Sequence, residues 1–169
     1  CDPSDNIIPM ADFEQDIMQN SFWSYLLNRS INSGGYVGKV SDFLYPDNTV
    51  AHTGTTSLRY HNEMLKKSFY MPIDIPVQKY SEYALSFWVK GEQLEGQKLG
   101  WQIHLNWESG TRDYTDPKNP INPQYYLKTE TMGEWTQYKY IIQTGDKDHI
   151  SLQIMDNGGT MWFDNFRLF

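Results

Sequence analysis

The chain has 169 residues, and its 14 lysines and arginines against 21 aspartates and glutamates give a formal charge of −7. A chain of this length is suited to one domain with one hydrophobic core. The negative charge and the lack of a Lys/Arg cluster exclude a nucleic-acid-binding protein, because that binding depends on cations that release counterions from phosphates. No apolar run is long enough to span a membrane.

The chain begins with a short polar segment, Cys-Asp-Pro-Ser-Asp-Asn, at 1–6. This start resembles that of a mature bacterial lipoprotein, in which a signal peptidase cuts just before a cysteine that is then lipidated. It predicts a lipid anchor on Cys1 and a place in the bacterial cell envelope, at the outer surface or in the periplasm. The alternative is a free cysteine at an arbitrary boundary. Because Cys1 is the only cysteine, an internal disulfide and a cysteine-based zinc site are excluded.

The segment 15–55 is rich in aromatic residues without a sustained period, which predicts a long ordered loop with one short strand and one or two helical turns within 17–27. A second, exposed loop is expected at 109–124, which contains three prolines. Elsewhere apolar and polar residues alternate, most clearly in 99–107. This alternation predicts eight strands, at 56–62, 68–75, 83–90, 99–108, 125–130, 135–143, 149–155 and 161–168. The expected fold is an all-β antiparallel sandwich that occupies 7–169 as a single domain.

Several short motifs follow one another in a recognisable order along nearly the whole chain. They are Asp-Phe-Glu at 12–14, Trp23, His-Thr-Gly-x-x-Ser-Leu at 52–58, Tyr-x-Leu-Ser-Phe-Trp-Val-Lys-Gly at 83–91, Glu-Trp-Thr at 134–136 and Phe-Asp-Asn-Phe-Arg-Leu at 163–168. Together they resemble the carbohydrate-binding modules of families 4, 9, 16 and 22. The chain departs from the usual pattern in Asp164-Asn165, where Asp-Asp is typical, and in the length of 15–55.

The resemblance implies a jelly-roll β-sandwich of the galactose-binding-like type, with a convex and a concave sheet. The strands at 56–62, 161–168, 83–90 and 135–143 would form the convex sheet, and those at 68–75, 149–155, 99–108 and 125–130 the concave one. Trp101 is in phase with the core residues of its strand and is expected to be buried. Trp88 is out of phase with its apolar neighbours, so we expect it to face outward beneath the N-terminal segment.

The polar face of the expected concave sheet is the predicted carbohydrate site. Its tyrosines would stack on the C–H faces of sugar rings, while its amides and its histidine would bond hydroxyl groups. An ordinary solvated face is the alternative, but such a face usually carries Lys, Glu and Thr rather than Gln-x-His-x-Asn. Trp23 and Tyr36, in the aromatic loop, either anchor that loop or add a stacking platform. The predicted carbohydrate-binding residues are Tyr70, Gln102, His104, Asn106, Tyr126, Gln153, Trp23 and Tyr36.

The resemblance also implies a structural Ca²⁺ ion held by Glu14, Asp164 and backbone carbonyls of 52–57. Mixed carboxylate and carbonyl oxygens suit Ca²⁺, and such an ion would tie both ends of the chain to the turn at Thr53 and Gly54. The alternative is that Asp164 caps a turn while Glu14 is solvated.

Catalysis is not expected, because a glycoside hydrolase needs two carboxylates about 5–9 Å apart. Only Asp74 is acidic on the predicted face, with Glu108 at its rim. The expected partners are a poly- or oligosaccharide and glycan-degrading proteins, not nucleic acid, and a membrane only through a lipid on Cys1. The first alternative is a structural or adhesive sandwich that docks a protein partner through 15–55. The second alternative is a jelly-roll glycoside hydrolase.

Overall fold

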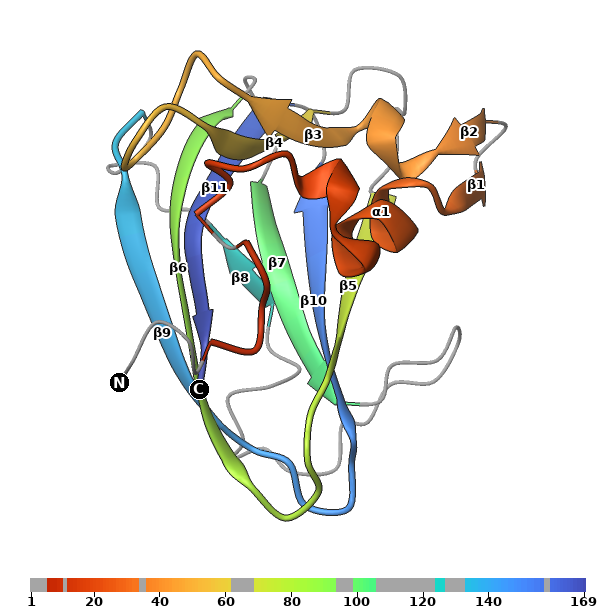
Figure 1. Cartoon of the computed structure of the whole chain (residues 1–169), viewed down its shortest axis with the longest axis vertical. Helices are drawn as coiled ribbons and strands as arrows, with labels where there is room; N and C mark the ends of the chain where they lie inside the picture. Colours follow the sequence, from red (N-terminus) through yellow and green to blue (C-terminus); the bar gives the residue numbers. More distant parts are fainter. Residues whose placement is uncertain are drawn as a thin grey trace.

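The computed structural model describes residues 6–10, 12–33, 36–61, 69–93, 99–105, 124–126, 133–156 and 159–169. Two antiparallel sheets face each other, and the N-terminal segment with helix α1 lies across the space between them (Figure 1). Within these residues, no helix has the length and apolarity needed to cross a membrane. Cys1 and most of 109–124 lie outside the described residues.

The larger sheet has five strands in the order β3-β4-β11-β6-β9. Their bounds are β3 (Leu44–Asp47), β4 (Ser57–His61), β11 (Gly159–Leu168), β6 (Glu82–Gln93) and β9 (Thr136–Gln143). The smaller sheet has four strands in the order β5-β10-β7-β8. These are β5 (Phe69–Pro76), β10 (His149–Asp156), β7 (Leu99–Leu105) and β8 (Gln124–Tyr126). The division of the eight expected strands between two sheets is therefore confirmed.

The segment 15–55 is more regular than predicted. It contains the 3₁₀ helices η2 (Ile17–Gln19) and η3 (Val40–Asp42), helix α1 (Ser21–Leu27), the hairpin β1 (Ser30–Ser33) and β2 (Tyr36–Lys39), and strand β3. Helix α1 begins where the side chain of Asn20 accepts hydrogen bonds from the backbone N–H groups of Phe22 and Trp23. Its buried residues are Trp23, Leu26 and Leu27, which lie on one helical face at a spacing of three and four.

The core lies between the two sheets, and Trp101 of β7 joins them. Its side chain is fully buried, as expected from its phase in the strand. The indole Nε1 donates to the hydroxyl of Tyr140 in β9 at 2.9 Å. The indole ring also meets Tyr138 and Phe87 edge to face, with centroids 4.6 Å and 5.3 Å away. The contacts of this one side chain therefore hold the four-stranded sheet against two strands of the other sheet.

The two ends of the domain lie beside each other. The backbone N–H of Ile7 donates to the carbonyl of Leu168 at 2.9 Å. The side chain of Asn6 donates to the carbonyl of Phe166 at 2.8 Å and accepts from the N–H of Leu168 at 2.9 Å. The N-terminal segment thus pairs with the last strand of the five-stranded sheet.

Candidate functional site

The face of the four-stranded sheet that points away from the core brings most of the predicted residues together. Ile103 and Leu152 are fully buried, so the alternate positions of β7 and β10 belong to the opposite face of the pleat. The register aligns these positions across the strands. The three rows are Tyr70–Met155–Gly100–Tyr126, Pro72–Gln153–Gln102–Gln124 and Asp74–Ser151–His104.

The predicted residues occupy neighbouring positions in these rows. Tyr70, Gln102, His104, Tyr126 and Gln153 all share this face, and the structure describes their backbone. The two other residues considered for this face, Asn106 and the rim acid Glu108, lie outside the described residues.

Gln124 is a position that the prediction missed. It is level with Gln102, which is itself level with Gln153, so three glutamines form one row across β10, β7 and β8. The period-two spacing to Tyr126 was the signal that would have found Gln124, but the predicted strand began one residue too late.

Two small residues at outward positions of this face are covered. Ser151 is fully buried although it occupies an outward position, and Gly100 is also buried. Solvent therefore does not reach the sheet at these two positions of β10 and β7.

Trp23 is not a stacking platform, and this part of the prediction is wrong. Its side chain is 1% exposed and packs edge to face on Phe13, with ring centroids 5.3 Å apart. Its indole Nε1 donates to the carbonyl of Pro9 at 2.7 Å. Trp23 therefore anchors the N-terminal segment. Tyr36 lies in β2 opposite Ser33, in a hairpin that extends beside α1 (Figure 1), and its side chain lies outside the described residues.

Glu14 binds the turn formed by 52–56 through hydrogen bonds. Its carboxylate accepts from the backbone N–H of Thr55 at 2.9 Å, from the N–H of Thr56 at 3.0 Å and from the hydroxyl of Thr55 at 3.0 Å. The hydrogen bond from the N–H of Thr56, together with those from Thr55, lowers the pKa of Glu14 below its ordinary value against the opposing effect of desolvation. Glu14 is exposed but not free, so the solvated alternative does not hold.

Asp164 of β11 binds the same turn from a buried position. Its carboxylate accepts from the backbone N–H groups of His52 at 3.0 Å and Thr53 at 3.2 Å, and from the N–H of Asn165 at 2.8 Å. Burial raises the pKa of Asp164 above its ordinary value even though all three amides oppose that shift. Asp164 is thus a buried acceptor that caps the turn, which was the alternative considered for it.

These contacts do not match the ligand set of a calcium ion. Both carboxylates face N–H and O–H donors of the turn, whereas Ca²⁺ would need carbonyl oxygens at those positions. Among the described residues, no group of three or more His, Cys, Asp or Glu side chains is suited to hold a metal. The turn is joined to both ends of the chain as expected, but by amide donors. The Ca²⁺ ion predicted at Glu14 and Asp164 is untested, and these contacts do not favour it.

The backbone around this turn is left-handed at three residues. Phe13, Gly54 and Asn165 have φ of +59°, +66° and +53°, and they flank or face the two carboxylates. Glycine adopts this φ without strain, and a Cβ added to Gly54 would have to displace the carboxylate of Glu14. Asn165 tolerates the left-handed region better than most residues, and its amide donates to the Thr53 hydroxyl at 2.9 Å. An aspartate at 165 would lack that donor.

The turn also covers the upper part of the outer face of the five-stranded sheet. The imidazole of His52 stacks on Trp88 of β6 with centroids 3.9 Å apart, and it meets Trp135 edge to face at 5.7 Å. Trp88 does face outward, as predicted, but His52 covers it rather than the N-terminal segment.

Beside this stack, aromatic and charged side chains alternate across four strands of the same face. Tyr45, Arg59, Trp162 and Lys90 are level with one another in β3, β4, β11 and β6. The guanidinium of Arg59 lies 5.5 Å from the Tyr45 ring centroid, and the ammonium of Lys90 lies 5.7 Å from that of Trp162.

Asp47 fixes one member of this row, because its carboxylate accepts from Nε1 of Trp162 at 3.0 Å. Although burial opposes the shift, hydrogen bonds from Thr49 and Trp162 and the charge of Arg59 lower the pKa of Asp47 below its ordinary value. The hydrogen bond to Asp47 and the two cation–ring contacts therefore hold the side chains of this row in place.

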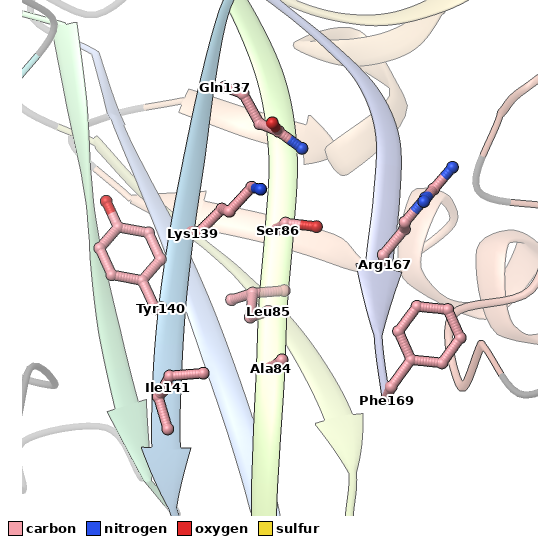
Figure 2. Close-up of a pocket in the computed structure, with 9 residues that line it drawn as sticks. All are labelled: Ala84, Leu85, Ser86, Gln137, Lys139, Tyr140, Ile141, Arg167 and Phe169. Atoms are coloured by element: carbon pink, nitrogen blue, oxygen red, sulfur yellow. The ribbon is translucent and has the colours of Figure 1, made fainter. Parts of the chain in front are cut away.

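The lower part of this face holds an open groove of about 370 Å³, which we call the outer groove (Figure 2). Its floor is the outer side of β6 between β9 and β11. Polar and cationic side chains lie toward one end, and apolar side chains toward the other (Figure 2). The side chains that face outward in it are Ala84, Ser86, Gln137, Lys139, Ile141, Arg167 and Phe169.

Comparison with protein families gives one match that covers most of the chain. The family described as "Carbohydrate binding domain", of the CBM 4/9 type, matches residues 21–159. No curated protein sequence matches the chain.

Solved structures of low sequence identity share the fold. TmCBM61, solved in complex with β-1,4-galactotriose, is 15% identical, with 97% of each chain covered and a TM-score of 0.54. The C-terminal family 22 carbohydrate-binding module of Clostridium thermocellum Xyn10B is 13% identical, with a TM-score of 0.52, and the match covers 74% of this chain and 79% of that one. The enzymatically active domain of bacteriophage CBA120 tailspike protein 4 is 12% identical, with a TM-score of 0.59, over 96% of this chain and 21% of that one.

Proposed function

The chain belongs to the family of carbohydrate-binding domains, and from that premise we propose that it binds its poly- or oligosaccharide on the outer face of the four-stranded sheet, without catalysis. The observation that carries this proposal is the cross-strand register of β5, β10, β7 and β8. It aligns amide, tyrosine and imidazole residues in adjacent rows on one face of the sheet.

The spacing of these rows suits a sugar chain. Rows on one face of a strand are about 6.6–6.8 Å apart, which approaches the size of a pyranose ring. The middle row carries Gln153, Gln102 and Gln124, whose residue type can donate to and accept from sugar hydroxyls. The adjacent row carries Tyr70 and Tyr126, whose residue type supplies apolar surface for the C–H face of a ring.

Binding without turnover is consistent with the distribution of acids on this face. Asp74 is the acidic member of the three rows, and glycoside hydrolysis needs a second carboxylate about 5–9 Å away. We expect the domain to release no reducing sugar from α- or β-linked glycans. Turnover that is abolished by Asp74→Asn or Glu108→Gln would contradict this proposal.

Calorimetric titration after a glycan array tests the site. Gln102→Ala and Tyr126→Ala should each weaken binding of the best array ligand about five- to tenfold, because each removes about 1–1.5 kcal/mol of hydrogen bonding or stacking. The thermal unfolding midpoint should change little. β-1,4-Galactotriose is a suitable neutral oligosaccharide to include, since the similar structure TmCBM61 was solved with it.

Gln78→Ala is the matched control, because Gln78 is exposed and follows β5 outside the three rows. It should bind as the unmodified domain does. If Gln102→Ala and Tyr126→Ala also retain full affinity, the site lies elsewhere on the domain even though the domain binds sugar.

A further inference from the structure

The outer groove carries two cations on strands that flank β6, in a chain of net charge −7. Arg167 of β11 is level with Ser86 of β6, and Ser86 is level with Lys139 of β9. The two Cα positions therefore lie about 9.5 Å apart, at two strand spacings, which flexible Lys and Arg side chains can bridge around one small anion. Both side chains are exposed, and neither forms an ion pair within the described part of the chain.

No acid of the described part of this sheet forms an ion pair with Lys139 or Arg167. Asp164 is buried and accepts from the backbone N–H groups of His52, Thr53 and Asn165. Glu82 of β6 accepts a hydrogen bond from the side chain of Gln143, and the carboxylate of Asp47 is bound by Trp162 and Thr49. The two cations of the groove are therefore free to pair with a ligand.

The groove also has a polar, cationic end and an apolar end, and an anionic sugar can contact both. Toward one end, the amide of Gln137, the ammonium of Lys139 and the hydroxyl of Ser86 lie over β6, while the side chain of Arg167 extends from the neighbouring β11 with its guanidinium directed away from them (Figure 2). Toward the other end lie Ala84, Ile141 and Phe169 (Figure 2). Ile141 is 53% exposed, which leaves its side chain available for contact. A volume of about 370 Å³ is within the range of ligand pockets.

We propose that the outer groove is a second carbohydrate site, which takes a sugar unit carrying a carboxylate, such as a uronic acid residue of an acidic glycan. Lys139 and Arg167 hold the carboxylate, and the planar guanidinium suits it because it can donate two parallel hydrogen bonds. Ser86 and Gln137 bond neighbouring hydroxyls. The C–H face of the ring lies against Ile141 and Phe169. This assignment rests on the carbohydrate binding of the family but not on the site proposed for the four-stranded sheet.

A bare inorganic anion would use only half of the groove. Sulfate or phosphate would satisfy Arg167 and Lys139 but would make no contact with Ile141, Ala84 or Phe169. A neutral oligosaccharide would leave the two cations without a partner. A monoanionic sugar uses both ends at once, and this is the chemistry that the experiment must separate from the two alternatives.

The test is a two-dimensional NMR titration of the ¹⁵N-labelled domain with oligosaccharides of uronic acid. The matched ligand is the same oligosaccharide after reduction of its carboxylates to primary alcohols, and sodium sulfate is the third arm. We expect the uronate to shift the amide signals of Ser86, Lys139 and Arg167. The carboxyl-reduced form should bind this groove at least tenfold more weakly, and sulfate should also bind it more weakly than the uronate does. Raising the salt from 50 mM to 500 mM should weaken the uronate complex.

Arg167→Gln and Lys139→Gln should each weaken uronate binding about tenfold, since each removes a charged hydrogen-bond donor. Lys90→Gln is the control, because Lys90 lies on the same sheet face but over Trp162 and outside the groove. Equal affinity for the uronate and its reduced form would overturn the proposal. Sulfate binding as tightly as the uronate would reduce the groove to a general anion site. The absence of uronate shifts in the groove would exclude the site altogether.

The same spectra separate this inference from the site on the four-stranded sheet. Shifts at Gln102 and Gln153 upon addition of a neutral glycan test the first site, whereas uronate shifts at Ser86 and Arg167 test the second. Either set can appear without the other. Uronate shifts confined to β7 and β10 would support the first site and overturn the second.

Discussion

The two sheets of this domain share one core but present different outer faces. The four-stranded sheet carries neutral amides and tyrosines at outward positions in register. The five-stranded sheet carries cations and indoles, which the turn 52–56 covers over its upper part and leaves open over the outer groove. In each sheet the inner positions are apolar, so the core constrains one half of every strand. The comparison shows that the outward positions of a strand can differ between the two sheets while the inner positions stay apolar, and the two proposed sites follow from that difference in charge.

The largest expected effect comes from Trp101, whose side chain joins the two sheets in the core. Trp101→Ala should lower the free energy of unfolding by about 3–5 kcal/mol, because it removes a fully buried indole and leaves a cavity between the sheets. Urea denaturation measures this loss. Binding at both outer faces should fall together in the variant. If one face keeps its affinity while the other loses it, the sheets are more independent than the shared core implies.

The next effect is expected at the turn that covers only the five-stranded sheet. Gly54→Ala should cost about 2–3 kcal/mol of stability, because the left-handed backbone disfavours a side chain and the new Cβ would displace the carboxylate of Glu14. Gly145→Ala is the control, since Gly145 has a similar φ of +55° but nothing within 4 Å of an added Cβ. The difference between the two variants in chemical denaturation measures the contact with Glu14. Equal losses would show that this contact contributes nothing.

A smaller effect is expected in the row formed by Tyr45, Arg59, Trp162 and Lys90 on the outer face of the five-stranded sheet. Trp162→Phe should lower stability by about 1 kcal/mol at neutral pH, because it removes the indole hydrogen bond to Asp47. The pKa of Asp47 should then rise toward its ordinary value of 3.8, which an NMR titration of its carboxyl carbon would detect. Because a lowered pKa stabilises the fold above the unfolded pKa, the difference between the variant and the parent should shrink as the pH falls through that range. A pKa of Asp47 that stays unchanged would contradict this account.

The smallest expected effect is at Glu14, whose side chain is exposed. Its lowered pKa means that its hydrogen bonds stabilise the fold above the ordinary value of 4.5 and lose that contribution as the pH falls through the folded-state pKa. Glu14→Gln should therefore lower the thermal midpoint at pH 7 and match the parent in strong acid. Asp164 acts in the opposite sense, because its raised pKa makes its ionisation cost stability as the pH rises.

The same melting experiment tests for calcium at the turn. Since N–H donors already occupy the two carboxylates, we expect neither EDTA nor added Ca²⁺ to change the midpoint of the parent. A midpoint that rises with calcium concentration would show that the turn can rearrange to present carbonyl oxygens. That rise should then be absent in Glu14→Gln.

Alternation along the chain was sufficient to predict the eight strands outside 15–55, but it did not predict β1, β2 and β3 or which strands pair with one another. The inner and outer phases of 83–90 and 99–105 follow from the sequence because each strand has one buried face. The order of the strands in each sheet was predicted from the resemblance to a known family. Arg167, Ser86 and Lys139 are far apart in the chain, so no local pattern connects them. The outer groove follows only when the outward phase of each strand is combined with the order β11-β6-β9.

The misassignment of Trp23 has a local cause. Trp23, Leu26 and Leu27 have helical spacing behind an N-capping Asn20, but the stretch is only seven residues long and has too few turns to establish a period. A short helix of this kind depends on tertiary packing, so the one or two helical turns expected within 17–27 did not show whether Trp23 would be buried. The missed Gln124 differs in kind, because the alternation was present and only the strand boundary was placed too late.

The pairing of Asn6 and Ile7 with the last strand has a consequence for how the domain can be joined to other chains. Since Ile7 and Leu168 are hydrogen-bonded neighbours, a polypeptide that entered at one and left at the other would arrive and depart at nearly the same point. The domain could then be inserted into a surface loop of a host protein without separating the two sides of that loop. The geometry would also allow a circular permutant in which a short linker joins the two ends. Tension applied to them would load the three hydrogen bonds of Asn6 and Ile7 before it reached the sheets.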